Sequence, residues 1–366
     1  KTLWQPGTDH AGIATQNVVE KQLLKEGTTK EALGREKFLE RVWKWKEFSG
    51  GTIVHQMRKL GVSPAWSRER FTMDEGLKEA VKEAFVKLYD EGMITQNNYM
   101  VNWCTHDGAL SDIEVEHEEV NGKFYHMNYH FADGSGFVTV ATTRPETYFG
   151  DSAVMVHPDD ERYTNIVGRE VVLPLTNRKI KVITDSHVDM SFGTGVVKVT
   201  PAHDTNDYEV GKRHDLEFIT CFDEKGILND YCGEFAGLER LEARKPIVEK
   251  LEKEGFIVKI EDHIHQVGHC YRCKNIVEPY ISKQWFVKKE VAKKSIEKTY
   301  AGEAKFHPSH WLNSYRAWMD ELRDWCISRQ LWWGHRIPVF YCDDCGHQWA
   351  DKADVPHSCP KCASKN

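Results

Sequence analysis

The 366-residue sequence predicts an α/β protein in which a β-rich module interrupts a more helical parent domain. Helical periodicity dominates residues 15–91, short alternating or β-branched runs dominate residues 97–200, and helical patterns return after residue 238. With 40% hydrophobic and 11% aromatic residues, the chain can build two or three cores. The order helical, β-rich, helical therefore favours an inserted β domain.

The first helical region contains a clear start and stop. Asp74 precedes an apolar pattern with a spacing of three or four residues and can cap a helix, and Gly92 can end it. The apolar positions of this pattern are Leu77, Val81, Phe85 and Leu88. Their spacing predicts one amphipathic helix between Asp74 and Gly92.

Short runs separated by Gly, Asp and Pro in the following region are typical of strands. These runs are residues 124–131, 137–141, 166–173 and 179–184. Two further helices are predicted, one at residues 238–254, before Gly255, and one at residues 314–327. The expected apolar face of the second helix consists of Trp318, Leu322, Trp325 and Cys326.

The composition excludes several classes of protein. The formal net charge of -7 gives no overall attraction to nucleic acid, so any RNA contact would use local basic surfaces. No apolar run approaches the roughly 18 to 20 residues of a membrane span, and no signal sequence opens the chain. We therefore expect a cytoplasmic protein. Because the chain starts at Lys1 in the middle of a pattern and stops at Asn366, we also expect an internal fragment.

The most informative segment is GTGVVKVTPAHDTNDYEVG, which begins at Gly193. Residues 196–200 alternate as in a strand, so Lys198 and Thr200 lie on one face and can line a pocket. A lysine on the inward face of an apolar strand is costly unless it has a partner or a cavity. The pattern therefore points to a polar site rather than to an ordinary core strand.

The end of this segment predicts a strand-to-helix junction. Pro201 cannot continue a central strand, and Asp204 and Asp207 suit the N-cap and the first turn of a helix. Two carboxylates beside unpaired helix amides could hold an ammonium group. The alternative is that this D-x-x-D pattern is only a helix cap.

A second polar cluster, ATTRPET at residues 141–147, lies upstream of this segment. Together the two resemble the editing site of class I synthetases for branched aliphatic amino acids. GTDHAGIATQ at residues 7–16 and WCISRQLWWGHRIPV at residues 325–339 resemble the catalytic domain of valyl-tRNA synthetases, on either side of the insertion. An isoleucine enzyme is the alternative in this superfamily, but it carries a different version of the first segment. A non-catalytic RNA-binding module is the alternative from another class.

The resemblance implies part of a Rossmann-type catalytic domain with an inserted β-rich editing domain and a small zinc ribbon. The implied ranges are 1–112 and 263–341 for the catalytic domain, 113–262 for the editing domain and 342–366 for the ribbon. The implied activity is ATP-dependent attachment of valine to tRNA(Val), with hydrolytic editing of threonyl-tRNA(Val). Valine, tRNA(Val) and ATP with Mg²⁺ are the implied partners of the full-length enzyme, which we expect to be a monomer without membrane contact.

For the amino-acid pocket, the resemblance places Pro6 and Asp9 against valine, with Asp9 holding the α-ammonium. Trp332 and Trp333 fall where the pocket is walled, although one of two adjacent tryptophans is expected in the core. Weaker candidates are Trp4, His10 and Gln330. The His-X-Gly-His and Lys-Met-Ser-Lys-Ser signatures, which stabilise phosphate charge during activation, are missing. The chain as given is therefore expected to retain at most editing.

A pocket that accepts valine cannot strongly reject the nearly isosteric threonine, so a second site must require the hydroxyl. By resemblance, Asp207 would hold the α-ammonium, while Arg144 and Lys198 would face the phosphate or terminal adenosine of the tRNA. The side chains that read the hydroxyl would be Asp204 and Thr200, with Thr142, Thr143 and Thr147. A positioned water would cleave the ester. A Ser-His-Asp mechanism using His203 is the weaker alternative.

Four cysteines near the C-terminus predict a structural zinc site. They form two Cys-x-x-Cys pairs, Cys342 with Cys345 and Cys359 with Cys362. Two disulfides are the alternative, which a cytoplasmic setting disfavours.

A third cysteine pair is less clear. Cys270 and Cys273 can combine with Cys104, but Asp107 stands where the zinc-bearing relatives have a fourth cysteine. His106, Asp107 or His269 could complete a second metal site, and a knuckle without metal is the alternative. The remaining thiols, Cys221, Cys232 and Cys326, are expected in the core.

Overall fold

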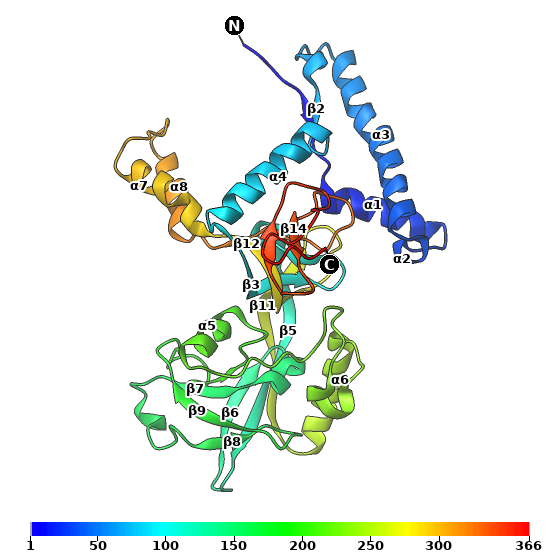
Figure 1. The fold of residues 1–366 in the computed structure, drawn as a ribbon. Coiled ribbons are helices and arrows are strands. Elements are labelled where there is room, and N and C mark those ends of the chain that lie inside the picture. Colours follow the sequence, from blue (N-terminus) through cyan, green and yellow to red (C-terminus); the bar gives the residue numbers. More distant parts are fainter. Residues whose placement is uncertain (1, 366) are drawn as a thin grey trace. The chain divides into compact units, whose positions relative to one another are not determined.

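The chain, described over residues 2–365 in a computed structural model, divides into two compact units (Figure 1). Unit 1 contains the residues up to Asn97 and those from Gln284 onward, and unit 2 is Asn98–Lys283. Two strands, β3 (Ile94–Cys104) and β12 (Val277–Val287), lead from one unit into the other. The insertion of unit 2 into unit 1 is thus visible in the chain path.

The first part of unit 1 is mainly helical, with one short parallel strand pair formed by β1 and β2. Its elements are β1 (Gly7–Thr8), α1 (Gly12–Lys25), α2 (Lys30–Leu33), α3 (Arg35–Lys59), η1 (Trp66–Arg68), β2 (Arg70–Phe71) and α4 (Glu75–Asp90). The predicted helix between Asp74 and Gly92 is confirmed as α4. The Asp74 carboxylate accepts the Leu77 amide at 2.9 Å, which satisfies one of the free donors of the first turn.

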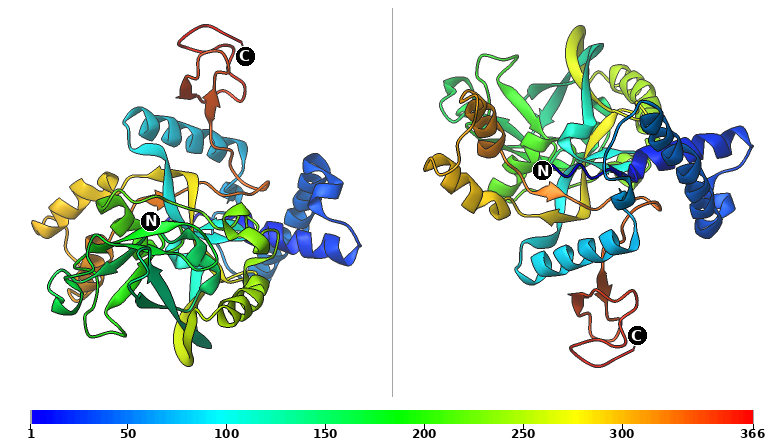
Figure 2. Two further views of the ribbon diagram at one scale, coloured as in Figure 1. Left: turned by 90° about the horizontal axis from the view of Figure 1, so that it is seen from below. Right: turned by 90° about the horizontal axis from the view of Figure 1, so that it is seen from above.

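The second part of unit 1 contains short helices and strands. Its elements are η6 (Lys289–Ala292), α7 (Lys293–Tyr300), α8 (Trp311–Asp320), β13 (Trp325–Cys326), β14 (Val339–Tyr341) and β15 (Gln348–Ala350). The antiparallel β14 and β15 are the centre of a small C-terminal module, drawn in orange to red in Figure 2.

The helix predicted at residues 314–327 is wrong in its second half. Helix α8 ends at Asp320, and Trp325 and Cys326 pair as a strand with Val287 and Phe286 of β12. Its expected apolar face does not form either, since Trp318 is 64% exposed. Backbone pairing with a strand far away in sequence has overridden the local periodicity.

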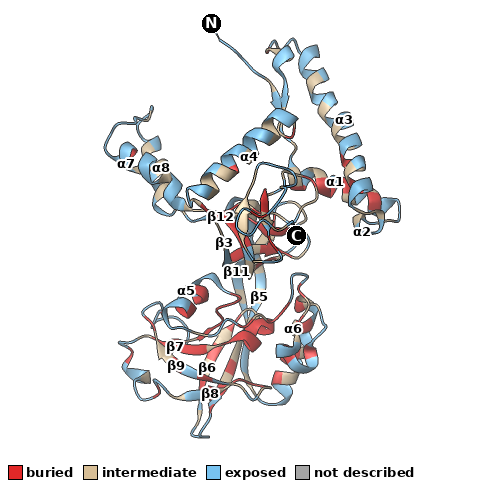
Figure 3. Cartoon of the chain, in the orientation of Figure 1, coloured by how far each residue is buried: buried red, intermediate tan, exposed pale blue. Residues whose placement is uncertain are grey.

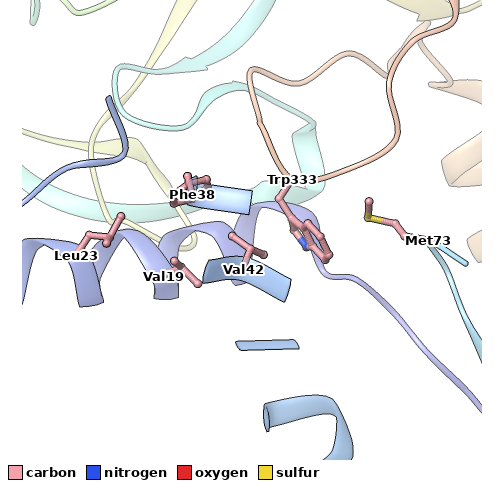
Figure 4. Packing of buried hydrophobic residues seen from close by; sticks show 6 residues of the cluster. All are labelled: Val19, Leu23, Phe38, Val42, Met73 and Trp333. Atoms are coloured by element: carbon pink, nitrogen blue, oxygen red, sulfur yellow. The ribbon is translucent and has the colours of Figure 1, made fainter. Parts of the chain in front are cut away.

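The core of unit 1 joins α1 and α3 to the segment after β13 (Figure 4). The buried members of this cluster are Val19, Leu23, Phe38, Val42, Met73 and Trp333. Trp43 meets Trp333 edge to face, with ring centroids 4.9 Å apart. Much of α3 and α4 is nevertheless exposed (Figure 3).

Unit 2 contains a seven-stranded mixed sheet. Its order is β10-β7-β9-β8-β5-β11, with β6 also paired to β5, and only the β7–β9 pair is parallel. These strands are β5 (Val115–Phe131), β6 (Phe137–Thr142), β7 (Ala153–Val156), β8 (Glu170–Val172), β9 (Lys179–Thr184), β10 (Val196–Val199) and β11 (Ile257–Cys270). Within this sheet β7 is wholly buried and β10 largely so, whereas most residues of β11 are exposed or half-buried (Figure 3).

The smaller elements of unit 2 lie before β5 or between the strands of this sheet in the sequence. They are β4 (Gly108–Leu110), η2 (Asp112–Glu114), η3 (Pro145–Gly150), η4 (Glu161–Tyr163), α5 (Thr205–Arg213), η5 (Asp230–Phe235) and α6 (Arg240–Lys253). Strands β3 and β12 belong to a separate four-stranded sheet with the order β13-β12-β3-β4. No helix in the described part of the chain is long and apolar enough to cross a membrane.

The strands and helices predicted for unit 2 are confirmed with shifted ends. Of the strand predicted at residues 166–173, only the part that forms β8 is a strand. The strand predicted at residues 179–184 is β9. The helix predicted at 238–254 is α6, which starts later because Glu239 caps it through the Leu241 and Glu242 amides.

We predict that Ile247→Ala on α6 destabilises the folded chain by about 2–5 kcal/mol, because this side chain is fully buried and its loss leaves a cavity. The matched control is Ile264→Ala on β11, which is 59% exposed and should change the free energy of unfolding by less than about 0.5 kcal/mol. Urea unfolding of both variants measures the difference. Equal effects would contradict the packing described for α6.

Candidate functional site

A cavity of about 320 Å³ opens in unit 2 where β6 and β10 end and α5 begins. All eight residues predicted for the editing pocket line it: Thr142, Thr143, Arg144, Thr147, Lys198, Thr200, Asp204 and Asp207. Volumes of about 300–1,000 Å³ are usual for small-molecule sites. The fold thus brings both sequence segments to one cavity.

The strand-to-helix junction forms as the sequence predicts. Strand β10 ends before Thr200, and a turn follows in which the His203 amide donates to the Thr200 carbonyl at 3.0 Å. Asp204 caps α5, because its Oδ1 accepts the amides of Asn206 at 2.8 Å and Asp207 at 3.0 Å. This cap fixes the first turn of α5 beside the cavity.

Asp207 is buried and lies close to a second carboxylate, that of Asp204. Its Oδ2 accepts the Thr200 amide at 2.8 Å. Burial, together with the neighbouring charge of Asp204, raises the pKa of Asp207 to about 7. A ligand ammonium beside the carboxylate would favour the ionised form again. This geometry suits a group that binds a cation in a partly enclosed pocket.

Lys198 is held by a buried partner that the sequence alone did not reveal. Asp151 is fully buried, and its Oδ1 lies 3.1 Å from Lys198 Nζ and accepts the Thr200 hydroxyl at 2.7 Å. The Tyr129 hydroxyl donates to the other oxygen, Oδ2, at 2.7 Å. Burial alone would lower the pKa of Lys198, but the charges of Asp151 and Asp207 outweigh it and raise that pKa.

These bonds define what the Thr200 hydroxyl can do. It donates its only proton to Asp151 and accepts a bond from Lys198. One lone pair remains, so Thr200 can accept a hydrogen bond from a ligand hydroxyl but cannot donate one. The sequence does contain a signal for Asp151, because this acidic residue stands just before the wholly apolar strand β7. A carboxylate buried beside such a strand needs a buried partner.

His203 is not arranged as a catalytic base. Its ring is 1% exposed, and Nε2 accepts the Cys221 amide at 2.8 Å. Burial and the charge of Arg144 lower the pKa of His203 well below its usual range. No serine is among the described residues that line the cavity. The arrangement gives no support to a Ser-His-Asp mechanism.

The residues predicted for the valine pocket lie in unit 1, where they differ from one another in exposure and in their contacts. The side chain of Asp9 is 73% exposed, and Oδ1 accepts the Ala11 amide at 3.1 Å, which lowers the pKa of Asp9. His10 contacts the Thr72 hydroxyl at 2.7 Å. Pro6 lines a separate small cavity of about 50 Å³ together with Met57 and Trp66.

The two adjacent tryptophans differ in burial. Trp333 is 1% exposed in the core of unit 1, and its indole nitrogen donates to the His10 carbonyl at 2.9 Å. Trp332 is only partly buried and meets Phe38 edge to face. Gln16 accepts both tryptophan amides, at 2.9 and 3.2 Å, and so joins α1 to this segment. Among the weaker candidates, Trp4 is 58% exposed and Gln330 donates to Gln284.

The four C-terminal cysteines form one cluster with free thiols. The Sγ atoms of Cys342 and Cys362 lie 3.5 Å apart, and those of Cys345 and Cys359 lie 3.8 Å apart. A tetrahedral site with Zn–S bonds of about 2.3 Å separates its sulfurs by about 3.8 Å. The donor set and the spacing therefore fit a structural zinc ion.

A second group of metal-type ligands lies in unit 2. Cys104, Cys270 and Cys273 come together with Asp107, whose Oδ2 accepts the Cys270 thiol at 3.1 Å. His106 contacts Asp107, while His269 Nδ1 faces a backbone carbonyl, so neither belongs to this group among the described residues. In the same knuckle, two buried nitrogens of Arg272, Nε and Nη1, find no hydrogen-bond partner among residues 2–365.

The two-unit fold and the polar cavity agree with the family that the sequence motifs indicate, a class of tRNA synthetases. The family model described as tRNA synthetases class I (I, L, M and V) matches residues 1–360, and the chain belongs to this family.

Within the family, the chain is similar to proteins named valine–tRNA ligase. It is 70% identical over 362 residues to the one from Wolinella succinogenes, which covers 99% of this chain and 40% of that relative. It is 68% identical over 366 residues to the one from Campylobacter jejuni, covering 100% and 42%, and 71% identical over 364 residues to the one from Nitratiruptor sp., also covering 100% and 42%. The chain thus spans about two fifths of these relatives.

The raised pKa of Asp207 predicts a pH-dependent difference between the wild type and Asp207→Asn. Because the folded pKa is about 7 and the unfolded pKa is about 4, the contribution of this group to stability is complete below about pH 4 and is lost as pH rises through 7. The unfolding free energy of the wild type should therefore fall relative to the variant between pH 5 and pH 8. A constant difference, measured by urea unfolding, would mean that Asp207 is ionised throughout.

Proposed function

We propose that this chain is the part of a valine–tRNA ligase that hydrolyses threonyl-tRNA(Val), and that the whole enzyme attaches valine to tRNA(Val) with ATP and Mg²⁺. The names of the relatives support the ligase. The editing activity rests on one observation, the cavity in which Asp204, Asp207 and Thr200 lie together. Asp207 binds the α-ammonium of the misattached amino acid.

The acceptors in this cavity explain selection for threonine over valine. Thr200 offers one lone pair, and Asp204 uses only Oδ1 in its helix cap among the described bonds. A threonine hydroxyl satisfies an acceptor, whereas valine places a methyl group there and leaves the acceptor without water or a partner. The hydroxyls of Thr142, Thr143 and Thr147 complete the polar wall.

Hydrolysis needs a water molecule beside the ester and a fixed substrate. The ammonium contact with Asp207 and the hydroxyl contact with Thr200 or Asp204 hold two ends of the amino acid, which orients the ester carbonyl. No covalent nucleophile is required. The water attacks the carbonyl carbon, the bond to the ribose oxygen breaks, a proton from the water passes to that oxygen, and threonine and tRNA leave separately.

We propose the domain ranges given by the resemblance, with 113–262 as the editing domain and 342–366 as the ribbon. That unit 2 folds around its own sheet and contains the whole of 113–262 supports the first range. The remaining ranges, 1–112 and 263–341, belong to the Rossmann-type catalytic domain. Asp9 and Trp332 are then the groups of the valine site that are accessible in unit 1, together with Pro6, while Trp333 supports them from the core.

We further propose that Cys342, Cys345, Cys359 and Cys362 hold a structural zinc ion. Bound zinc would supply a closed four-thiolate crosslink for a segment in which the described residues, up to 365, form regular structure only in β15, the partner of β14. The chain's own part is to bring two knuckles together. The Cys342 amide donates to the His347 carbonyl and the Cys359 amide to the Ser364 carbonyl, which closes each knuckle.

The editing proposal predicts selective release of threonine by this chain. Deacylation of threonyl-tRNA(Val) and valyl-tRNA(Val) should differ by at least about tenfold in kcat/KM, since a pocket with hydroxyl acceptors discriminates strongly. Asp207→Ala should abolish release with the fold retained in circular dichroism. Equal hydrolysis of both esters, or loss of activity only through unfolding, would refute the assignment.

The zinc proposal predicts that Cys359→Ser lowers the zinc content by one equivalent per chain. The control is Cys232→Ser, which removes an equally buried thiol outside both clusters and should leave the metal content unchanged. Metal analysis after exhaustive dialysis makes the comparison. An unchanged zinc content in Cys359→Ser would show that the four thiols do not form the site.

A further inference from the structure

The arrangement around Arg144 points to a positioning role that differs from contact with tRNA. We propose that the buried carboxylate of Glu278 holds the Arg144 side chain in one position. Through this side chain, it also positions the backbone turn that leads into Asp204 and Asp207. This inference rests on the proposed editing function and deepens it. It replaces the expectation that Arg144 faces a phosphate or the terminal adenosine.

Glu278 is the centre of this arrangement. It lies on β12, is 1% exposed and is far in sequence from the cavity residues. Its Oε1 accepts Arg240 Nε at 2.7 Å, and its Oε2 accepts Arg144 Nη2. A carboxylate as buried as that of Glu278 is stable in its ionised form only when charged donors surround it. The guanidinium groups of Arg144 and Arg240 supply these donors.

Three sides of the Arg144 guanidinium face protein groups. Besides the bond to Glu278, Nη1 donates to the His203 carbonyl at 2.6 Å, and Nε lies 3.6 Å from Glu146 Oε1. The His203 carbonyl belongs to the turn directly before Asp204. Arg144 therefore ties this turn to β12 and η3, two segments distant in sequence.

A second ion pair stiffens the same side of the cavity. Glu146 is fully buried, and Arg244 donates to both of its oxygens, at 2.7 and 2.8 Å. Burial alone would lower the pKa of Arg244, but the charge of Glu146 and the hydrogen bonds to it raise that pKa. Arg240 and Arg244 are one turn apart on α6, so both ion pairs also dock this helix.

The charge balance argues against a phosphate-binding role. Glu278 and Glu146 together offset most of the positive charge of Arg144, Arg240 and Arg244, and the Arg144 side chain is only 24% exposed. A guanidinium that already bridges a carboxylate and a carbonyl has a planar, fixed geometry, which a lysine ammonium cannot reproduce. Arg144 is thus built as a bridge.

The first test measures deacylation of threonyl-tRNA(Val) by Glu278→Gln. If Arg144 is a bridge, kcat should fall by about ten- to a hundredfold with KM for the tRNA unchanged, because the turn with Asp204 and Asp207 is misplaced. If Arg144 instead contacts phosphate, neutralising Glu278 leaves more free positive charge, so KM should fall and kcat should stay constant. That second result would overturn the proposal. Asp133→Asn, which neutralises an exposed carboxylate paired with Arg169, is the control.

A second variant keeps the test decisive if Glu278→Gln does not fold. Arg144→Lys retains the positive charge, so a contact with phosphate should survive with a modest change in KM. If Arg144 acts as a bridge, lysine cannot replace it and kcat should fall. An unchanged kcat in this variant contradicts the bridge. Failure of the wild-type chain to release threonine would refute the editing function itself, which is a separate outcome.

Discussion

The cavity of unit 2 depends on one buried ion pair, between Lys198 and Asp151. An ammonium group that is largely removed from water requires a charged, hydrogen-bonded partner, and Asp151 meets this need together with the Thr200 and Tyr129 hydroxyls. The pair fixes the direction of the Thr200 proton and so leaves Thr200 an acceptor for a ligand. The polar character of the pocket and the free acceptor position that the proposed function assigns to a ligand hydroxyl both follow from this constraint.

A second layer of buried charge surrounds the first and gives the pocket its rigidity. Asp207 and Asp204 sit on one helix turn, and that turn is held from behind by Arg144 and Glu278. Burial disfavours the ionised form of Asp207, and the nearby Asp204 carboxylate adds to this effect, so the pKa of Asp207 is raised. In the proposed function, a ligand ammonium beside Asp207 would favour the ionised carboxylate, so recognition would depend on the same buried charges that hold the turn.

The features predicted from the sequence are those set by local physics. The caps at Asp74 and Asp204, the alternation of β10 and the cysteine spacing each depend on residues a few positions apart. The partners of Asp151 and Glu278 could not be assigned in this way, because they are distant in sequence; the acidic residue before β7 indicates a buried carboxylate at Asp151 but not the residue that pairs with it. The helix predicted for the residues after Asp320 is wrong for the same reason, since β13 forms through pairing with β12.

The most direct test of this account is the rate of threonyl-tRNA(Val) hydrolysis by Asp151→Asn, under conditions where circular dichroism shows the variant folded. Asparagine keeps the shape of Asp151 but removes the charge that Lys198 requires. The account predicts that hydrolysis falls by about ten- to a hundredfold, because Lys198 and Thr200 lose their fixed positions. An unchanged rate in the folded variant would show that the buried ion pair does not organise the pocket.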